Sequence, residues 1–175
     1  PPVLSDFYNT LLNNEDRPMI NRAIQAQYAP GSIFKPFVAL AAQEEGYNNQ
    51  LLYDCTGIYT DYSCRLRCAN RYGHGELDMC QALMKSCNPY FCYVGTEIGI
   101  QSILRVAQQA GFGELTGIDI GGEAKGFLPT PEWKQKRFNV AWHPVDTAQC
   151  AIGQGAITTT PLQMAHATAT LAMRG

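Results

Sequence analysis

Ser32 and Lys35 are a pair of residues whose types and spacing allow acyl-transfer chemistry. They lie three residues apart at the start of an expected helix, so their side chains share one helix face, roughly 5–6 Å apart at Cβ. A lysine there can take the serine proton if burial and its neighbours keep the amine neutral. Alone, this S-x-x-K spacing is weak evidence, because a capping serine followed by a solvated lysine is the commoner arrangement.

A second polar group, Ser86-Cys87-Asn88, falls at the expected junction between two helices. The Ser86 hydroxyl could relay a proton between lysine and a leaving group, and the Asn88 carboxamide could hydrogen-bond a substrate amide. The plainer interpretation is helix termination, since serine, asparagine and Pro89 are ordinary cap residues. On these residues alone, both interpretations stay open.

Six of the seven cysteines fall between positions 55 and 92, in a segment that also holds a histidine. The candidate metal ligands are Cys55, Cys68, His74 and Cys87. Three thiolates and an imidazole form a closed structural zinc set, although the spacing is not the short paired spacing of a zinc finger. Asp54 and Cys64 are substitute ligands if the loop register differs. Disulfides such as Cys55–Cys68 or Cys64–Cys68 are the alternative in an oxidising compartment, and free thiols are the third.

The elements that must position these residues are predicted to be mainly helical. Residues 1–31 should be irregular, because four prolines interrupt them. Helices are expected over 32–45, 77–85, 89–99, 101–110 and from Pro161 to about 172. The cysteine-rich segment 53–75 is expected to be a turn-rich loop, and 111–157 mostly loop, because it holds many glycines and prolines. Alternating strand patterns are scarce.

Length and composition restrict the class of protein. A chain of 175 residues with 46% hydrophobic and 16% charged residues suits one globular domain. A net charge of −2 gives no overall field that favours nucleic acid or an anionic membrane. No apolar run approaches the ~18 residues needed to span a bilayer. Because the chain starts at Pro1 without a signal peptide, we expect a piece of a longer protein that meets the membrane only through an absent N-terminal segment.

Four segments extend the two serine motifs: NRAIQAQYAPGSIFKP, GHGELDMCQALMKSCNPYFCYVG, GIDIGGEAKGFLPTPEWKQKRF and IGQGAITTTPLQMAHA. Together they resemble the transpeptidase domain of class B penicillin-binding proteins of the elongation type, from about Pro18 to Gly175. The resemblance implies an α+β, serine β-lactamase/transpeptidase-like fold, here mainly its helical part with much of the central sheet absent. The family's third motif, K-T-G, does not follow Ser86. Residues 1–175 are therefore expected to be a transpeptidase-domain fragment that ends before the K-T-G strand and acylates poorly or not at all.

The resemblance also implies a function. The intact protein would be a serine-type D,D-transpeptidase that cross-links peptidoglycan stem peptides during cell-wall elongation and is acylated by β-lactam antibiotics. The implied roles are Ser32 as nucleophile, Lys35 as base, Ser86 as proton relay and Asn88 as a contact to the donor peptide. Some elongation-type members bind zinc through positions that match the four candidate ligands. Proteins of the cell-elongation machinery are implied partners. The parent protein is expected at the periplasmic face of the bacterial inner membrane, and residues 1–175 are expected to be soluble.

Two other functions compete with this interpretation. A relative that hydrolyses or senses β-lactams would share the S-x-x-K and S-x-N motifs, but it would deacylate or signal instead of cross-linking peptides. A zinc-stapled, non-catalytic interaction module would use the same serines only as structural caps.

Overall fold

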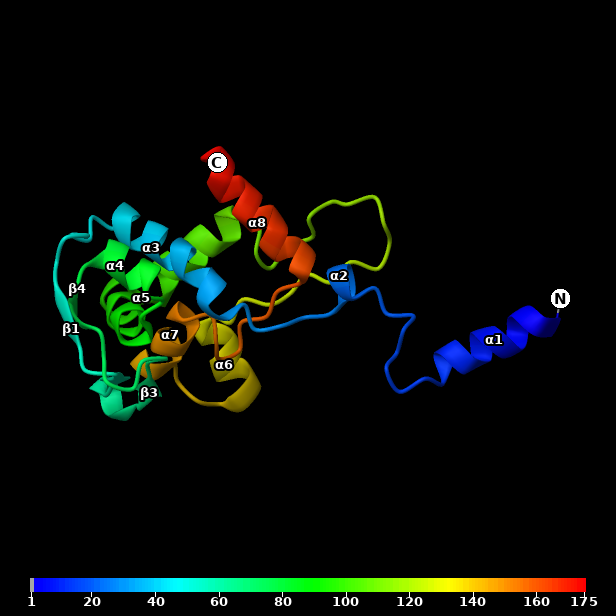
Figure 1. The fold of residues 1–175 in the computed structure, drawn as a ribbon, viewed down its shortest axis with the longest axis horizontal. Helices are drawn as coiled ribbons and strands as arrows, with labels where there is room; N and C mark the ends of the chain where they lie inside the picture. Colours follow the sequence, from blue (N-terminus) through cyan, green and yellow to red (C-terminus); the bar gives the residue numbers. More distant parts are fainter. Residues whose placement is uncertain (1) are drawn as a thin grey trace.

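The N-terminal helix α1 (Pro2–Leu12) extends away from the rest of the molecule in the computed structural model, which describes residues 2–175 (Figure 1). The short helix α2 (Arg22–Gln25) follows, with the Asn21 side chain capping its first turn. The prediction that 1–31 is irregular was therefore wrong at these two helices. Pro2 is the first residue of α1, where its missing N–H costs no helical hydrogen bond.

Three helices form the centre of the core: α3 (Lys35–Glu44), α5 (Asn88–Gln109) and α7 (Pro144–Ala151). Helix α5 packs against both α3 and α7, and Figure 1 shows it beside both. At the start of α3, the rings of Phe34 and Phe37 meet Phe112 edge-on, with centroids 5.3 and 5.0 Å away. Such aromatic packing fixes the first turns of α3 against the core.

Most predicted helices are confirmed, with differences at their ends. The helix expected over 32–45 is present as the 3₁₀ turn η1 (Gly31–Phe34) followed by α3. The helix expected over 77–85 is α4 (Met79–Met84), and the one expected from Pro161 is α8 (Pro161–Met173). The helices expected over 89–99 and 101–110 are one element, α5, with a kink at Gly99, whose φ of +79° suits glycine.

The prediction that 111–157 is mostly loop missed two helices, α6 (Pro131–Phe138) and α7. Helix α6 begins with a threonine cap, because the Trp133 N–H donates to the Thr130 hydroxyl at 3.1 Å, and Pro131 follows that cap. The same Thr-Pro signal correctly placed α8 and was available here.

The cysteine-rich segment contains short strands within an otherwise turn-rich loop. They are β1 (Tyr53–Cys55), β2 (Ile58–Tyr59), β3 (Leu66–Arg67) and β4 (Gly75–Leu77), with the 3₁₀ turn η2 (Asp61–Ser63) between β2 and β3. Antiparallel β1 and β4 pair, as do β2 and β3. The buried Tyr59 hydroxyl lies 3.1 Å from the Thr96 hydroxyl of α5, which ties the second pair to the core. Over residues 2–175, no helix is both long and apolar enough to cross a membrane.

Candidate active site and metal centre

Ser32 lies in the turn η1, and Lys35 is the first residue of α3. The Lys35 amine Nζ lies 3.2 Å from the Ser32 hydroxyl, so the structure brings the two side chains together as their spacing predicted. A backbone hydrogen bond holds this turn in place, because the Gly31 N–H donates to the Gly153 carbonyl at 2.8 Å. A Cβ on Gly153 would come within 2.2 Å of the Gly31 carbonyl oxygen, so only glycine allows this approach.

The Lys35 side chain is only 1% exposed and points into a set of oxygen atoms. Besides the Ser32 hydroxyl, three oxygens lie within hydrogen-bond distance of Nζ: the Ser86 carbonyl at 2.8 Å, the Ser86 hydroxyl at 3.0 Å and the Asn88 Oδ1 at 2.7 Å. Burial lowers the pKa of Lys35, and the charges of nearby cysteine sulfurs oppose this effect without overcoming it. A lysine with a lowered pKa is suited to accept a proton from a hydroxyl.

The junction between α4 and α5 places Ser86 and Asn88 beside this amine. Ser86 adopts a left-handed backbone conformation with φ of +51°, and both its hydroxyl and its carbonyl contact Lys35. Asn88 begins α5, and its Nδ2 donates to the Arg67 carbonyl at 2.9 Å. The two interpretations of this segment are thus compatible, because the residues at the helix junction also line the site. Sequence reasoning missed the Arg67 carbonyl, because a backbone acceptor has no side-chain pattern.

The four predicted metal ligands converge behind the catalytic candidates. Their ligand atoms all lie within 4.8 Å of one another: Cys55, Cys68, His74 and Cys87. The His74 Nδ1 is 3.8 Å from the Cys55 sulfur and 3.5 Å from the Cys68 sulfur. Zinc–ligand bonds of about 2.3 Å to sulfur and 2.05 Å to nitrogen in a tetrahedron give N–S separations of about 3.6 Å. The donor set therefore fits zinc in both chemistry and spacing.

Short backbone contacts create this convergence. The His74 N–H donates to the Cys55 carbonyl at 2.9 Å, where β1 meets β4. The Cys68 N–H donates to the Gly57 carbonyl at 2.9 Å, which sets Cys68 at the end of β3. The substitute ligands Asp54 and Cys64 are outside the group of four.

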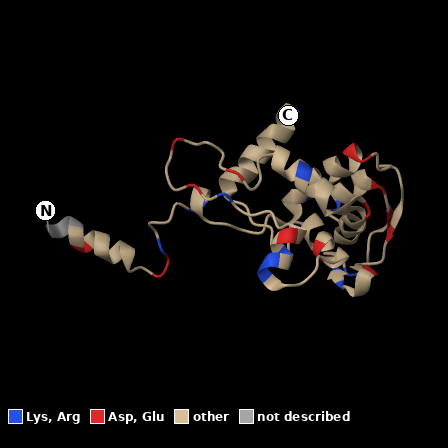
Figure 2. Ribbon diagram, turned by 180° about the vertical axis from the view of Figure 1, so that it is seen from behind, with Lys and Arg blue, Asp and Glu red and all other residues tan. Residues whose placement is uncertain are grey.

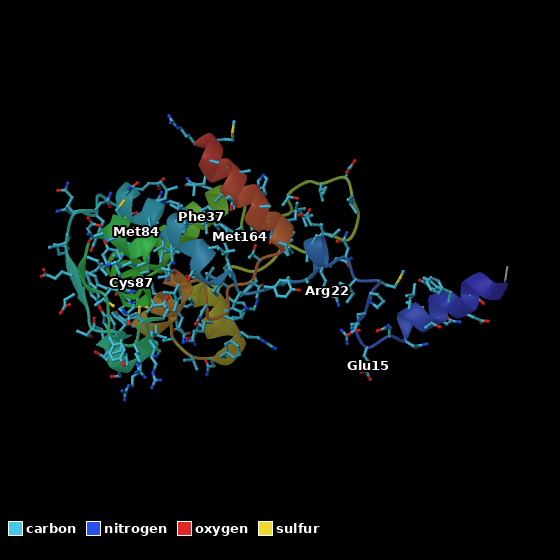
Figure 3. The ribbon with its side chains drawn as sticks, viewed as in Figure 1. Glu15, Arg22, Phe37, Met84, Cys87 and Met164 are labelled. Carbon is cyan, nitrogen blue, oxygen red and sulfur yellow. The ribbon has the colours of Figure 1, made fainter. Side chains whose placement is uncertain are left out.

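The thiols of the group are well shielded, and all seven cysteines of the chain are free of disulfides in the structure. Cys87 is fully buried, and burial raises the pKa of its thiol. Figure 3 shows Cys87 inside the body of the domain, at the helix junction. Two of the four candidate ligands are direct chain neighbours of site residues. Cys87 lies between Ser86 and Asn88, and Cys68 follows Arg67, whose carbonyl accepts from the Asn88 side chain.

Comparison with known proteins identifies the family and the fold of the chain. The profile of the penicillin-binding protein transpeptidase domain matches residues 5–175. Peptidoglycan D,D-transpeptidase MrdA of Haemophilus influenzae is 39% identical over 176 aligned positions, which cover 99% of this chain and 27% of that protein. The structure of Pseudomonas aeruginosa PBP2 in complex with WCK 5153 superposes with a TM-score of 0.91 at 36% identity, over 97% of this chain and 39% of that one.

A further solved relative is Helicobacter pylori PBP2 in its complex with MreC, with a TM-score of 0.86 at 34% identity, over 91% of this chain and 30% of that one. The chain thus spans about a quarter of the length of the curated relative it matches. These similarities confirm the predicted transpeptidase/β-lactamase-like fold class, of which the described residues form mainly helices. Sequence and structure together show that the chain belongs to the penicillin-binding protein transpeptidase domain family.

Proposed function

We propose that this chain is the nucleophile-bearing part of a peptidoglycan D,D-transpeptidase that acts in cell-wall elongation. The observation that carries the proposal is the buried Lys35 amine in contact with the hydroxyls of both Ser32 and Ser86. A lysine amine with a lowered pKa, placed between two hydroxyls, can accept a proton from one hydroxyl and pass it to the other. The name of the Haemophilus influenzae relative supports the choice of reaction.

In the proposed reaction, the Ser32 oxygen attacks the carbonyl carbon of the penultimate D-Ala of a stem peptide, and Lys35 takes the hydroxyl proton. The C–N bond to the terminal D-Ala then breaks, and its amine leaves with a proton delivered through the Ser86 hydroxyl. An amine of a second stem peptide attacks the acyl-enzyme, forms the cross-link and returns the proton, so that Ser32 is regenerated. Asn88 has one N–H left for the donor peptide, because the other donates to the Arg67 carbonyl. A β-lactam would acylate the same serine.

We also propose that zinc occupies the group of four ligands. Three thiolates and one imidazole fill a tetrahedral coordination shell and leave no open position, so the ion would supply structural cross-linking rather than catalysis. The buried sulfurs and the N–S distances of 3.5 and 3.8 Å support this assignment. The residues would hold the loop 55–74 against the start of α5, next to Ser86 and Asn88.

The same proposal names partners and location for the whole protein. Stem peptides and β-lactams would be its ligands, proteins of the elongation machinery its partners, and the periplasmic face of the bacterial inner membrane its place of action. The Helicobacter pylori relative is described in a complex with MreC, which supports a partner of that kind.

A fluorescent penicillin tests the proposal in the full-length protein. One label per molecule, mapped to Ser32 by mass spectrometry, is the expected result, and Ser32→Ala should stay unlabelled. Ser102→Ala, which removes a serine that bonds Glu45 on the surface, is the matched control and should label normally. Loss of the label within minutes would instead indicate a hydrolytic relative. An unlabelled but folded protein whose Ser32→Ala variant still supports cell-wall synthesis would indicate a non-catalytic module.

A further inference from the structure

Arginines gather on the loop that adjoins the candidate active site. Arg65, Arg67 and Arg71 occur within seven residues, and no acidic residue lies between Asp61 and Glu76. Figure 2 shows Lys or Arg positions on the ribbon around β3. The segment therefore carries a local positive excess in a chain whose net charge is −2. Such an excess favours binding of an anion.

Two of these arginines, Arg65 and Arg67, form no ion pair within residues 2–175. Both are exposed. By contrast, Arg105 is paired with glutamates on the surface. Arg71 lies over the ring of its neighbour Tyr72, 4.5 Å from the ring centroid. Unpaired guanidinium groups remain available to a ligand.

Strand register places Arg65 and Arg67 on the same side of the loop. Tyr59 pairs with Leu66, and the buried Tyr59 shows that this face is turned toward α5. Arg67 pairs with Ile58 on the opposite face, and Arg65 is two residues before it. Because side chains alternate along extended chain, the two arginines project together from the outer face.

The backbone of Arg67 is adjacent to the reacting groups. The Arg67 carbonyl accepts from Asn88 Nδ2 at 2.9 Å, and the Asn88 Oδ1 accepts from Lys35 Nζ at 2.7 Å. One side chain thus separates the backbone of Arg67 from the proposed base. Lys35 is buried among oxygen atoms and cannot also recognise a charged part of the substrate. An exposed cation beside the site is better placed to do so.

We propose that Arg65 and Arg67 bind a side-chain carboxylate of the donor stem peptide and so select acidic donors over amidated ones. This inference rests on the proposed transpeptidase function. Guanidinium forks bind carboxylates through paired, charge-assisted hydrogen bonds, which a neutral amide cannot reproduce. The two arginines are specificity residues in this proposal, because they act at a distance from the bond that breaks.

Acylation of the full-length protein by peptide thioester donors tests the inference. Two donors would differ only in this carboxylate, which is free in one and amidated in the other, and kcat/KM would be measured for each. The wild-type protein should prefer the acid about tenfold, which corresponds to about 1.4 kcal/mol. The Arg65→Gln/Arg67→Gln double variant should lose that preference by reacting more slowly with the acid alone. Arg137→Gln, which removes an exposed arginine of α6, should keep it.

Two further measurements separate a failure of the arginine assignment from a failure of the proposed function. The preference should shrink between 50 mM and 500 mM salt, because exposed charges are screened. Fluorescent penicillin labelling of each variant reports whether Ser32 is still reactive. Absent labelling of the wild type would defeat the proposed function itself. Normal labelling with an unchanged acid preference in the double variant would overturn only the arginine assignment, as would an equal loss of rate with both donors.

Discussion

If zinc occupies the group of four ligands as proposed, its removal is expected to destabilise the domain and to loosen the helix junction that holds Ser86. The change can be made with a chelator or by Cys68→Ser. In the structure, the loop 55–74 is otherwise held by the two pairs of short strands, by backbone hydrogen bonds, and by buried side chains such as Tyr59 that pack against α5. Metal binding free energy should therefore appear as folding free energy.

The magnitude follows from linkage. If free zinc exceeds its Kd about a thousandfold, binding to the folded state adds about 4 kcal/mol of stability. For a chain of this size, each kcal/mol shifts Tm by about 2–4 °C, so chelation should lower Tm by about 8–16 °C. Because Cys87 lies between Ser86 and Asn88, penicillin labelling of Ser32 should slow as well.

The assay is thermal unfolding followed by circular dichroism, on protein whose zinc content is measured by elemental analysis. Cys80→Ser is the matched control, since Cys80 is exposed and outside the group of four. Less than a tenth of an equivalent of zinc, in protein purified without chelator, would refute the metal assignment. An equal loss of Tm in Cys68→Ser and Cys80→Ser would refute the structural reasoning even with zinc present.

Four further outcomes follow from the site. Ser32→Ala should abolish covalent labelling by penicillin and change Tm by only about 1 °C, since it removes one 3.2 Å contact, and labelling at any other residue would contradict this assignment. Because burial lowers the pKa of Lys35 below 10.5, the neutral amine becomes available at lower pH. The acylation rate should therefore rise with pH and level off below the usual pKa range of lysine. A flat profile from pH 6 to 10 would contradict the role of Lys35 as base. In that window the unfolded chain binds more protons than the folded one, so this group's contribution to stability should rise with pH, and urea titrations of Lys35→Met should lack that slope. Gly153→Ala should lower the free energy of unfolding, measured with urea, by more than about 2 kcal/mol, against about 1 kcal/mol for Gly46→Ala. Both glycines have positive φ, but only a Cβ at Gly153 would meet a backbone atom at 2.2 Å. Equal losses in the two variants would exclude the clash.

The sequence predicted elements whose signals are local. The helix from Pro161 follows from a threonine cap and a proline, and the pairing of Ser32 with Lys35 follows from helical spacing. The same kind of cap at Thr130 shows that α6 was predictable too. Helix α1 was missed because prolines were taken as breakers even at a helix start, where they are tolerated.

Contacts between distant segments could not be predicted from spacing. The contact of Ser86 with Lys35 spans 51 residues; the residue types allowed a proton relay between them, but no spacing rule brings the two segments together. The four ligand types were identifiable, but their convergence depends on the register that places Cys55 opposite Gly75. The role of the Arg67 carbonyl, as acceptor for the Asn88 side chain, could not be predicted from the sequence, because it depends on the backbone path of β3.

The oxygen atoms around the Lys35 amine set the direction in which a proton can move. Four oxygens surround Nζ, whereas an ammonium group has three protons to offer. The Ser86 carbonyl and the Asn88 Oδ1 can only accept, while the two hydroxyls can also donate. A neutral amine satisfies both obligate acceptors with its two N–H groups and keeps a lone pair for a hydroxyl. The surroundings of Lys35 thus complement the amine in number and type, which leaves it ready to receive the proton of Ser32.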